Sequence, residues 1–305
     1  MAVLASRVRY EEKRIFAALE RRGVAYAHVD TRRLGDELGA GPSAGAGYAA
    51  ALNREISHSR GLYASLLLEA RGVPTVNTSD TITVCGDKLR TSLLLRRAGV
   101  PVPRTAVALA PEAGADAAER LGFPVVIKPL AGSWGRLVAA VHDRDQAETV
   151  LEHRAALPTP QQHIVYLQEL VDKPGRDIRV IVAGDEVVGA TYRYSDGWRT
   201  NAARGARSEP CPLTPELTGP ARAAARAVGG GVLGVDLVEG PGGPLVLEVN
   251  HTVEFQGFQD AHGDAVDVAD AIVAHLLDAA SRDGADPGPA TPAGTAPGAR
   301  RGEAT

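Results

Sequence analysis

Hydrophobic and polar positions in the first quarter of the chain follow the periods of short strands and amphipathic helices. Residues 2–4, 24–29 and 73–76 have the apolar pattern of strands, and 11–22 and 62–70 that of helices. Helices between strands predict a small parallel α/β lobe over residues 1–77. Within it, residues 39–47 are only Gly, Ala, Pro and Ser, which predicts a mobile surface insertion.

The rest of the pattern predicts a linker and two further lobes. Residues 78–104 form the linker helix, capped by Ser79-Asp80 and carrying Lys88 in its interior. The central lobe, 105–169, has helices over 111–121 and 144–153, and the C-terminal lobe, 170–283, ends in a helix over 265–280. Residues 284–305 lack large apolar side chains, which predicts a disordered tail.

Composition narrows the function classes. The 305 residues are 44% hydrophobic, which is ample for several cores. No apolar run approaches the roughly 20 residues of a membrane span, and the N-terminus lacks the features of a signal peptide, so we expect a cytoplasmic protein. Cys85 and Cys211 lie far apart, which suits a reducing compartment. A net charge of −4 argues against nonspecific nucleic-acid binding.

Two neighbouring apolar stretches carry three oxygen-bearing side chains. Residues 234–238 contain Asp236, a Pro-Gly-Gly turn follows, and 245–250 end in Glu248-Val249-Asn250. Glu248 and Asn250 are two apart and share a face of the strand, while Val249 points to the core. This oxygen set favours Mg²⁺ or Mn²⁺ over zinc. Two such carboxylates alone are more often solvent-facing charges on a hairpin.

Two more segments suit a nucleotide. The strand 125–128 ends at Lys128 and leads to Gly132-Ser133-Trp134-Gly135, whose backbone amides can close over phosphate oxygens. The strand Tyr166–Val171 carries Gln168, Glu169, Leu170 and Val171, where Glu169 can accept from an adenine amine and the next residues offer main-chain groups. Taken singly, the first segment is more often just a hairpin, and the second is a plain edge strand.

The order and spacing of these motifs resemble the ATP-grasp ligases. Cys85-Gly86-Asp87-Lys88, Gly-Ser-Trp-Gly-Arg at 132–136, Lys173–Arg179 and Glu248-Val249-Asn250-His251-Thr252 are similar to the LysX type within that family. The resemblance covers the chain to about residue 280. It implies an ATP-grasp fold of α/β and α+β lobes, with a parallel N-terminal lobe and ATP between the central and C-terminal lobes.

The resemblance also implies the chemistry. ATP and one or two Mg²⁺ or Mn²⁺ ions would activate the C-terminal glutamate of a small acidic amino-group carrier protein as an acyl phosphate. The amine of α-aminoadipate, or of a related amino acid, would then form an amide. Nucleic acid and membrane partners are not expected, whereas a homo-oligomer, tetrameric in many family members, is.

The same resemblance assigns roles residue by residue. Asp236, Glu248 and Asn250 would hold the metal, Lys88 and Lys128 the phosphates, and Asp177 the ribose or neighbouring arginines. Arg179, Arg193, Asn201 and Arg204 would lie at the transferred phosphoryl group. His58, Arg60, His251, Thr252 and Phe258 are candidates for the amino-acid substrate, with selectivity set by 254–259 and the 193–201 loop.

Two other functions stay open. A glutamate ligase acting on a ribosomal protein tail or a small cofactor shares the fold and the acyl-phosphate chemistry. A nucleotide-binding protein without ligase activity is the alternative outside enzymes, and the joint presence of Asp236, Glu248, Asn250, Lys88 and Lys128 argues against it.

Overall fold

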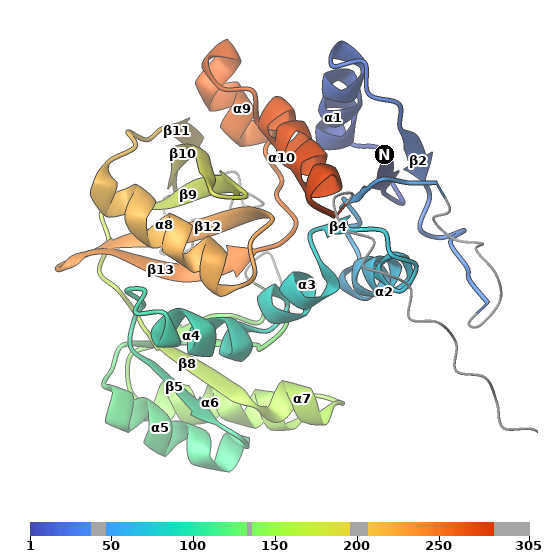
Figure 1. Ribbon diagram of the computed structural model, residues 1–305. Coiled ribbons are helices and arrows are strands. Elements are labelled where there is room, and N and C mark those ends of the chain that lie inside the picture. Colours follow the sequence, from blue (N-terminus) through green and yellow to red (C-terminus); the bar gives the residue numbers. More distant parts are fainter. Residues whose placement is uncertain (38–46, 133–135, 196–206, 284–305) are drawn as a thin grey trace, which may run out of the picture.

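Three lobes, each built on its own sheet, make up the computed structural model (Figure 1). The structure describes residues 1–37, 47–132, 136–195 and 207–283. Most of the expected insertion, the expected tail, Ser133, Trp134 and Gly135 of the glycine loop, and Asn201 and Arg204 lie outside the described residues. No helix in the described part of the chain is both long and apolar enough to cross a membrane.

The N-terminal lobe is a parallel sheet between helices, as predicted. Its strands, in the order β2-β1-β3-β4, are β1 Ala2–Leu4, β2 Ala27–Val29, β3 Ala51–Asn53 and β4 Thr75–Val76. Helix α1 (Tyr10–Arg21) packs Ile15 and Leu19 on one face of the sheet. Helix α2 (His58–Glu69) covers the other face with Ala64 and Leu68. The carboxyl ends of the strands therefore meet at one edge.

The linker contains two helices, so the prediction of one helix with Lys88 in its interior is wrong. Helix α3 (Ser79–Cys85) is capped by Thr78, not by Ser79, because the Thr78 hydroxyl accepts from the Thr81 amide. Helix α4 (Lys88–Arg97) begins anew at Asp87, whose carboxylate accepts from two backbone amides. This second cap ends the first helix and places Lys88 in the first turn of the next.

The central lobe has an antiparallel sheet covered by helices on one face. The strands, in the order β5-β8-β6-β7, are β5 Thr105–Ala108, β6 Val125–Lys128, β7 Ala139–Val141 and β8 Val165–Glu169. The predicted helix at 111–121 is a 3-10 turn, η1 (Pro111–Ala113), followed by α5 (Gly114–Leu121). Helix α6 (Arg144–Ala155) packs beside α5, and a short α7 (Pro160–His163) precedes β8.

The C-terminal lobe contains the sheet that positions the site. Its antiparallel strands, in the order β11-β10-β9-β12-β13, are β9 Arg176–Ala183, β10 Glu186–Tyr194, β11 Arg207–Pro210, β12 Val232–Gly240 and β13 Gly243–Asn250. Helix α8 (Pro215–Ala227) packs on Ile178 and Val180. Side chains alternate along a strand, so Asp177 and Arg179 point to the opposite face.

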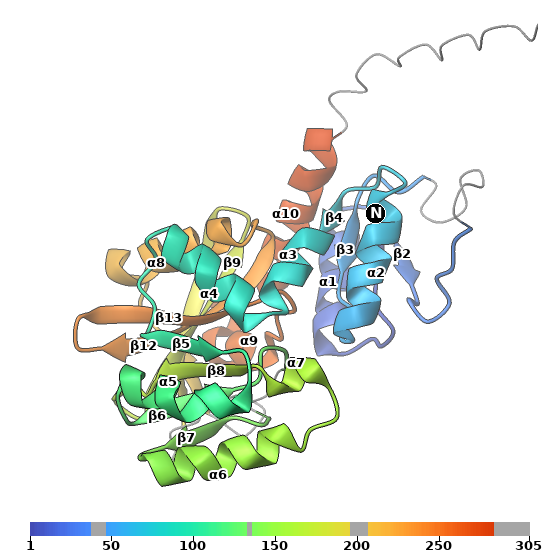
Figure 2. The same ribbon diagram turned by 90° about the horizontal axis from the view of Figure 1, so that it is seen from below.

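The C-terminal lobe and the N-terminal lobe share one apolar core. Helix α9 (Gln256–His262), η3 (Gly263–Ala265) and α10 (Val268–Asp283) follow the last strand, and α10 packs against α1. Ile181 and Val232 of the C-terminal sheet join Val3 and Leu52 of the N-terminal sheet in this core. Figure 2 shows α3 and α10 between these two lobes, with the central lobe on the other side of α4.

Candidate functional site

A row of charged side chains crosses the C-terminal sheet on the face opposite α8. Strand register pairs Arg193 with Asp177, Arg179 with Asp236, and Asp236 with Glu248. Directly paired residues of antiparallel strands project to the same side. The register therefore brings residues between positions 177 and 248 together on one face of four adjacent strands.

Asp236 is the anionic centre of this row. Its side chain is 5% exposed. Both Arg179 nitrogens Nε and Nη2 donate to it, and Arg193 Nη2 lies 3.1 Å from its Oδ1. Arg193 Nε also donates to Asp177 Oδ1 at 2.6 Å. Burial alone raises the pKa of Asp236, but the charges of Arg179 and Arg193 outweigh burial and hold that pKa below its usual value. The group is therefore ionised.

The three side chains predicted to bind metal come together. Asn250 Nδ2 lies 3.3 Å from Asp236 Oδ2 and 3.2 Å from Glu248 Oε1. Val249 is buried, as the alternation predicts. Among the described residues no group of three His, Cys, Asp or Glu could hold an ion, so a metal site here would need the Asn250 amide as its third donor. Turning that amide directs its oxygen to the same point, and such an oxygen set fits Mg²⁺ or Mn²⁺.

Two lysines lie near these carboxylates, Lys88 from the linker and Lys128 from the central lobe. Lys88 Nζ lies 3.6 Å from Glu248 Oε2 and donates to the Gly132 carbonyl at 3.0 Å. Lys128 donates to Gln168 Oε1. Burial, together with the charge of Lys88, lowers the pKa of Lys128 to about 8 despite the opposing charge of Glu248. Two cations and the start of the glycine loop thus face the carboxylates.

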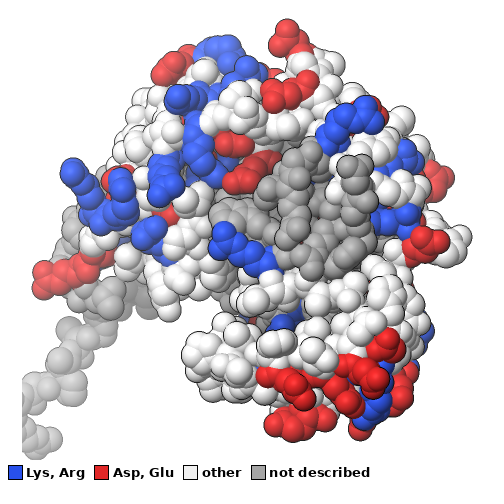
Figure 3. Space-filling view, turned by 180° about the vertical axis from the view of Figure 1, so that it is seen from behind, with Lys and Arg blue, Asp and Glu red and all other residues white. Residues whose placement is uncertain are grey.

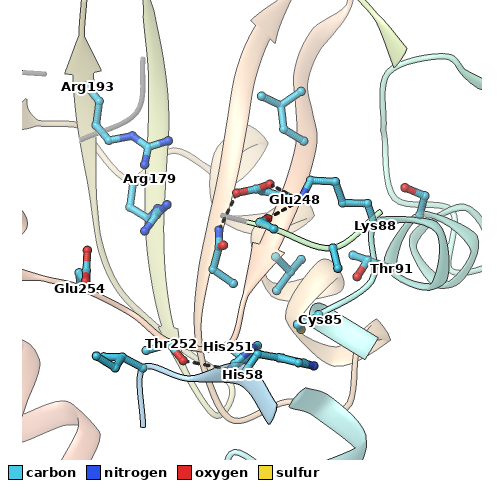
Figure 4. A pocket seen from close by; sticks show the side chains of 18 residues that line it. His58, Cys85, Lys88, Thr91, Arg179, Arg193, Glu248, His251, Thr252 and Glu254 are labelled. Carbon is cyan, nitrogen blue, oxygen red and sulfur yellow. Dashed lines mark hydrogen bonds and ion pairs between the residues drawn. The ribbon is translucent and has the colours of Figure 1, made fainter. Parts of the chain in front are cut away.

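Several of these groups line a cavity of about 290 Å³, namely Lys88, Gly132, Arg179, Arg193, Glu248 and Asn250. Figure 4 shows Lys88 reaching toward Glu248 from one side, and Arg179 and Arg193 on the other side. His58, His251 and Thr252 close one end of the cavity. Cys85 and Thr91 of the linker helices also line it, and the motif spacing did not single them out as site residues.

The two histidines at one end of the cavity, His58 and His251, are uncharged at neutral pH. His58 Nδ1 lies 3.4 Å from His251 Nε2, and Thr252 Oγ1 lies 3.0 Å from His251 Nδ1. Burial lowers the pKa of both rings, and the nearby charges of His58 and Arg54 contribute to a value of about 4 for His251. Both imidazoles are therefore neutral at neutral pH.

Two other substrate candidates lie elsewhere. Arg60 is 44% exposed on α2, and its Nη2 lies 3.5 Å from Glu55. Phe258 is buried in the core shared by the N-terminal and C-terminal lobes, where its ring occupies the space above Gly189. Phe258 does not line the cavity. The local sequence could not distinguish this core position from a substrate contact, because an aromatic residue suits both.

The predicted adenine segment is already engaged within the protein. Strand β8 ends at Glu169, whose carboxylate accepts from the Arg104 amide at 2.9 Å, and Gln168 is buried against Lys128. The Leu170 amide donates to the Pro124 carbonyl at 3.1 Å. The expected strand to Val171 is therefore two residues too long. Contacts of this segment with adenine stay a prediction.

Glu55 has a structural role that the sequence reasoning did not assign. It is 1% exposed and accepts from Ser6 N at 3.1 Å, Ser6 Oγ at 3.0 Å, Ser57 N at 2.8 Å, and the Thr31 hydroxyl. Burial raises its pKa, but these hydrogen bonds lower the pKa to about 2. Ser6, Thr31 and Glu55 each follow a strand of the N-terminal sheet, and that shared position was the available signal.

Charge is distributed unevenly over the surface around the site. Figure 3 shows Lys and Arg gathered on the upper part of one face and Asp and Glu gathered on the central lobe at the bottom. There Arg144 pairs with Asp116, Glu119 and Glu148. An acidic partner would be attracted to the upper part of this face and repelled by the central lobe.

Comparisons with known proteins agree with this arrangement. Residues 85–276 match the model of the RimK-like ATP-grasp domain, and residues 1–84 match that of the LysX preATP-grasp domain. A glutamate–LysW ligase, ArgX, of Sulfolobus acidocaldarius is 36% identical over 279 residues, which cover 90% of this chain and 97% of the relative. An α-aminoadipate–LysW ligase, LysX, of the same organism is 36% identical over 252 residues, 82% of this chain and 91% of the relative.

Solved structures show the same fold. A RimK domain ATP-grasp protein from Sphaerobacter thermophilus superposes with a TM-score of 0.76 at 32% identity, covering 90% of this chain and 98% of that one. A D-alanine–D-alanine ligase from Bacillus anthracis, solved with ATP, superposes with a TM-score of 0.67 at 17% identity over 92% and 96% of the two chains. The second likeness concerns the fold alone.

Proposed function

Because this chain belongs to the RimK-like ATP-grasp family of ligases and carries a LysX preATP-grasp domain, we propose that it joins an amino acid to a carrier protein. The acid is the C-terminal glutamate of a small acidic amino-group carrier protein. The amine is that of α-aminoadipate or of a related amino acid. The main support is the single cavity that brings Lys88 together with Arg179, Arg193, Glu248 and Asn250.

The first step transfers the γ-phosphoryl group of ATP to the glutamate carboxylate. The carboxylate oxygen attacks phosphorus, the bond to the bridging oxygen breaks, and ADP leaves. This step needs aligned reactants and neutralised charge more than a protein nucleophile. Asp236, Glu248 and Asn250 would hold a divalent cation, which when bound supplies charge neutralisation at the phosphates.

The cationic side chains complete the neutralisation. Lys88 and Lys128, from the linker and the central lobe, would contact the phosphates of ATP; the closeness of Lys88 to Glu248 and the effect of the Glu248 charge on Lys128 support this role. Arg179 and Arg193 are held in fixed orientations by Asp236. Fixed donors lower the barrier because they need no reorganisation as charge develops. Asn201, Arg204 and the glycine loop remain predicted contributors.

In the second step the amine attacks the acyl carbonyl and phosphate leaves. An amino acid arrives as an ammonium ion and must lose a proton before it can attack. The neutral His58 ring would offer its Nε2 as the acceptor at one end of the cavity. Arg60, exposed on α2, stays a predicted contact of a substrate carboxylate. His251 and Thr252 directly follow β13, the strand of Glu248 and Asn250. The proposed amine site would therefore lie next to the phosphoryl site.

Which amino acid is joined to the carrier is a separate question within the proposal. The relatives named for glutamate and for α-aminoadipate are both 36% identical to this chain, so identity does not separate them. A tetrahydromethanopterin:α-L-glutamate ligase of Methanosarcina acetivorans is 34% identical over 235 residues, 68% of this chain. That likeness supports a second candidate, a glutamate ligase acting on a small cofactor or a protein tail.

Intact-mass spectrometry of the carrier tests the proposal. The protein is incubated with Mg-ATP, a cognate carrier ending in glutamate, and either α-aminoadipate or glutamate, while ADP release is followed. We expect ADP release that requires both substrates and a carrier heavier by one amino-acid residue. A carrier lacking the terminal glutamate is the matched control. Modification of that control would refute the assignment, and a ladder of glutamate additions would favour the second candidate.

A further inference from the structure

Asn77 connects the N-terminal lobe to the strands that carry the candidate metal ligands. It follows β4 and is 3% exposed. Its Oδ1 accepts from Val232 N at 2.6 Å, and its Nδ2 donates to Val232 O at 2.9 Å and to His251 O at 2.6 Å. One carboxamide thus pairs with both polar groups of Val232 and with a carbonyl of a second segment.

The two residues that Asn77 contacts lie at the same end of the β12–β13 hairpin, which carries the candidate metal ligands. Val232 is the first residue of β12, which carries Asp236, and His251 directly follows Asn250 at the end of β13. Gly234 pairs with Asn250 in the register of the two strands. Asn77 therefore fixes the start of one ligand-bearing strand and the end of the other.

Asn77 is itself held by its own lobe. Ser65 Oγ donates to the Asn77 carbonyl at 3.2 Å, and Asn53 Nδ2 donates to Ser65 Oγ at 2.9 Å. Asn53 Nδ2 also donates to the Gly61 carbonyl at 2.8 Å. Ser65 and Gly61 belong to α2, whose first residue is His58. Hydrogen bonds through Asn77 therefore connect helix α2, which begins at His58, to His251, the residue after Asn250.

A glycine on the facing lobe makes room for this contact. Gly231 has φ +108°, and a Cβ built on it would lie 2.0 Å from Asn77 Oδ1. Its neighbour Gly230 has φ +77° and no atom within 4 Å of such a Cβ. Both backbones are in the left-handed region, but only Gly231 approaches Asn77.

We propose that Asn77 is a positioning residue for the reaction. It holds β12 and β13, the strands of the candidate metal ligands, in place relative to the histidine end of the cavity. The inference rests on the proposed function. Losing the carboxamide leaves the Val232 and His251 carbonyls without their donor and frees the hairpin end to shift. Because ligand geometry decides affinity for a divalent cation, the dissociation constant of the ion should rise roughly tenfold or more.

The test measures Mn²⁺ binding by electron paramagnetic resonance with a nonhydrolysable ATP analogue, so that no turnover is needed. Asn77→Ala should weaken Mn²⁺ binding about tenfold and lower kcat with little change in the KM for ATP. Asn77→Asp preserves the volume but presents oxygen to two carbonyls, so it should bind Mn²⁺ no better than Asn77→Ala. A residue that only fills space would tolerate this change.

Gly231→Ala and Gly230→Ala form the matched pair and cover the case in which Asn77→Ala does not fold. Both add a Cβ at a left-handed backbone, so both should lower Tm. Only Gly231→Ala should also weaken Mn²⁺ binding. Mn²⁺ affinity equal in the two glycine variants and in the wild type would overturn the inference. Failure of the wild-type protein to bind Mn²⁺ with the nucleotide analogue would instead count against the proposed function.

Discussion

Asp236→Asn should damage both stability and catalysis, whereas Glu248→Gln should damage catalysis alone. The two substitutions remove equivalent charges from paired positions of β12 and β13. Their surroundings differ: the Asp236 side chain is 5% exposed and contacts two arginines, while that of Glu248 is 30% exposed and lies 3.6 Å from one lysine. The pair therefore separates the structural contribution of a carboxylate from its catalytic one.

The magnitude follows from what each substitution leaves behind. Asparagine at 236 leaves the Arg179 guanidinium without its anion, while Arg193 keeps Asp177. Breaking a buried pair costs about 3–5 kcal/mol, and the remaining partner of Arg193 favours the lower end, about 3 kcal/mol. For a chain of 305 residues that is a Tm decrease of roughly 5 °C. A partly exposed pair such as Lys88–Glu248 contributes about 1 kcal/mol or less.

The pH dependence provides a second measurement. The pKa of Asp236 lies below its ordinary value of 3.8 in the folded protein, because the arginine charges outweigh burial. The stabilisation is therefore fully present above pH 3.8 and is lost as pH falls through the lower, folded pKa. The stability difference between Asp236→Asn and the wild type should be constant near neutral pH and shrink in acid.

Calorimetric Tm and single-turnover ADP formation, measured on the same preparations, check this prediction. Both variants should lose activity on the order of 100-fold, since each removes charge from the phosphoryl site. Equal Tm values for Asp236→Asn and Glu248→Gln would refute the reasoning. Full activity of Glu248→Gln would equally refute a metal site at these strands.

Three further predictions concern other parts of the chain. Because the pKa of Lys128 is lowered to about 8, kcat/KM for ATP should fall as pH rises through that value, and Lys128→Arg should remove this step in the pH profile. Glu55→Gln should lower the free energy of unfolding by roughly 3 kcal/mol near neutral pH, measured by urea denaturation, because a buried carboxylate loses charge-assisted hydrogen bonds. Since the pKa of Glu55 is lowered to about 2, that loss should disappear as pH falls from its ordinary 4.5 toward 2. Arg144→Ala removes three exposed ion pairs and should change stability by about 1 kcal/mol or less, with unchanged ADP formation; a larger loss would show that the surface cluster is structural.

The local pattern was informative where a segment's own residues determine its structure. Apolar runs predicted the strands of Val249 and Lys128, and Glu248 and Asn250 share a face because side chains alternate with period two. Helical spacing predicted α1 and α6 to within two residues at each end. The break between α3 and α4 was missed, because Asp87 was treated as an interior residue rather than a cap.

The candidate site was predicted as a set of motifs but not as a set of contacts. That Glu169 is engaged by Arg104, and that Phe258 belongs to the core, follow from neighbours distant in sequence. No spacing rule relates such residues, because their approach depends on how the sheets pack. The same reason hid Glu55 and Asn77, which look like ordinary polar residues after short strands.

The sequence by itself determined the strands and their exposed or buried faces, and the order of the motifs that carry Asp236, Glu248 and Asn250, since these depend on local periodicity and residue chemistry. Only the tertiary structure decided which cation meets which anion. Arg179 and Arg193 approach Asp236 through strand register, and His58 meets His251 across 193 residues because the N-terminal lobe packs on the C-terminal one. Register and lobe packing are collective properties of the folded chain, so no single segment encodes them.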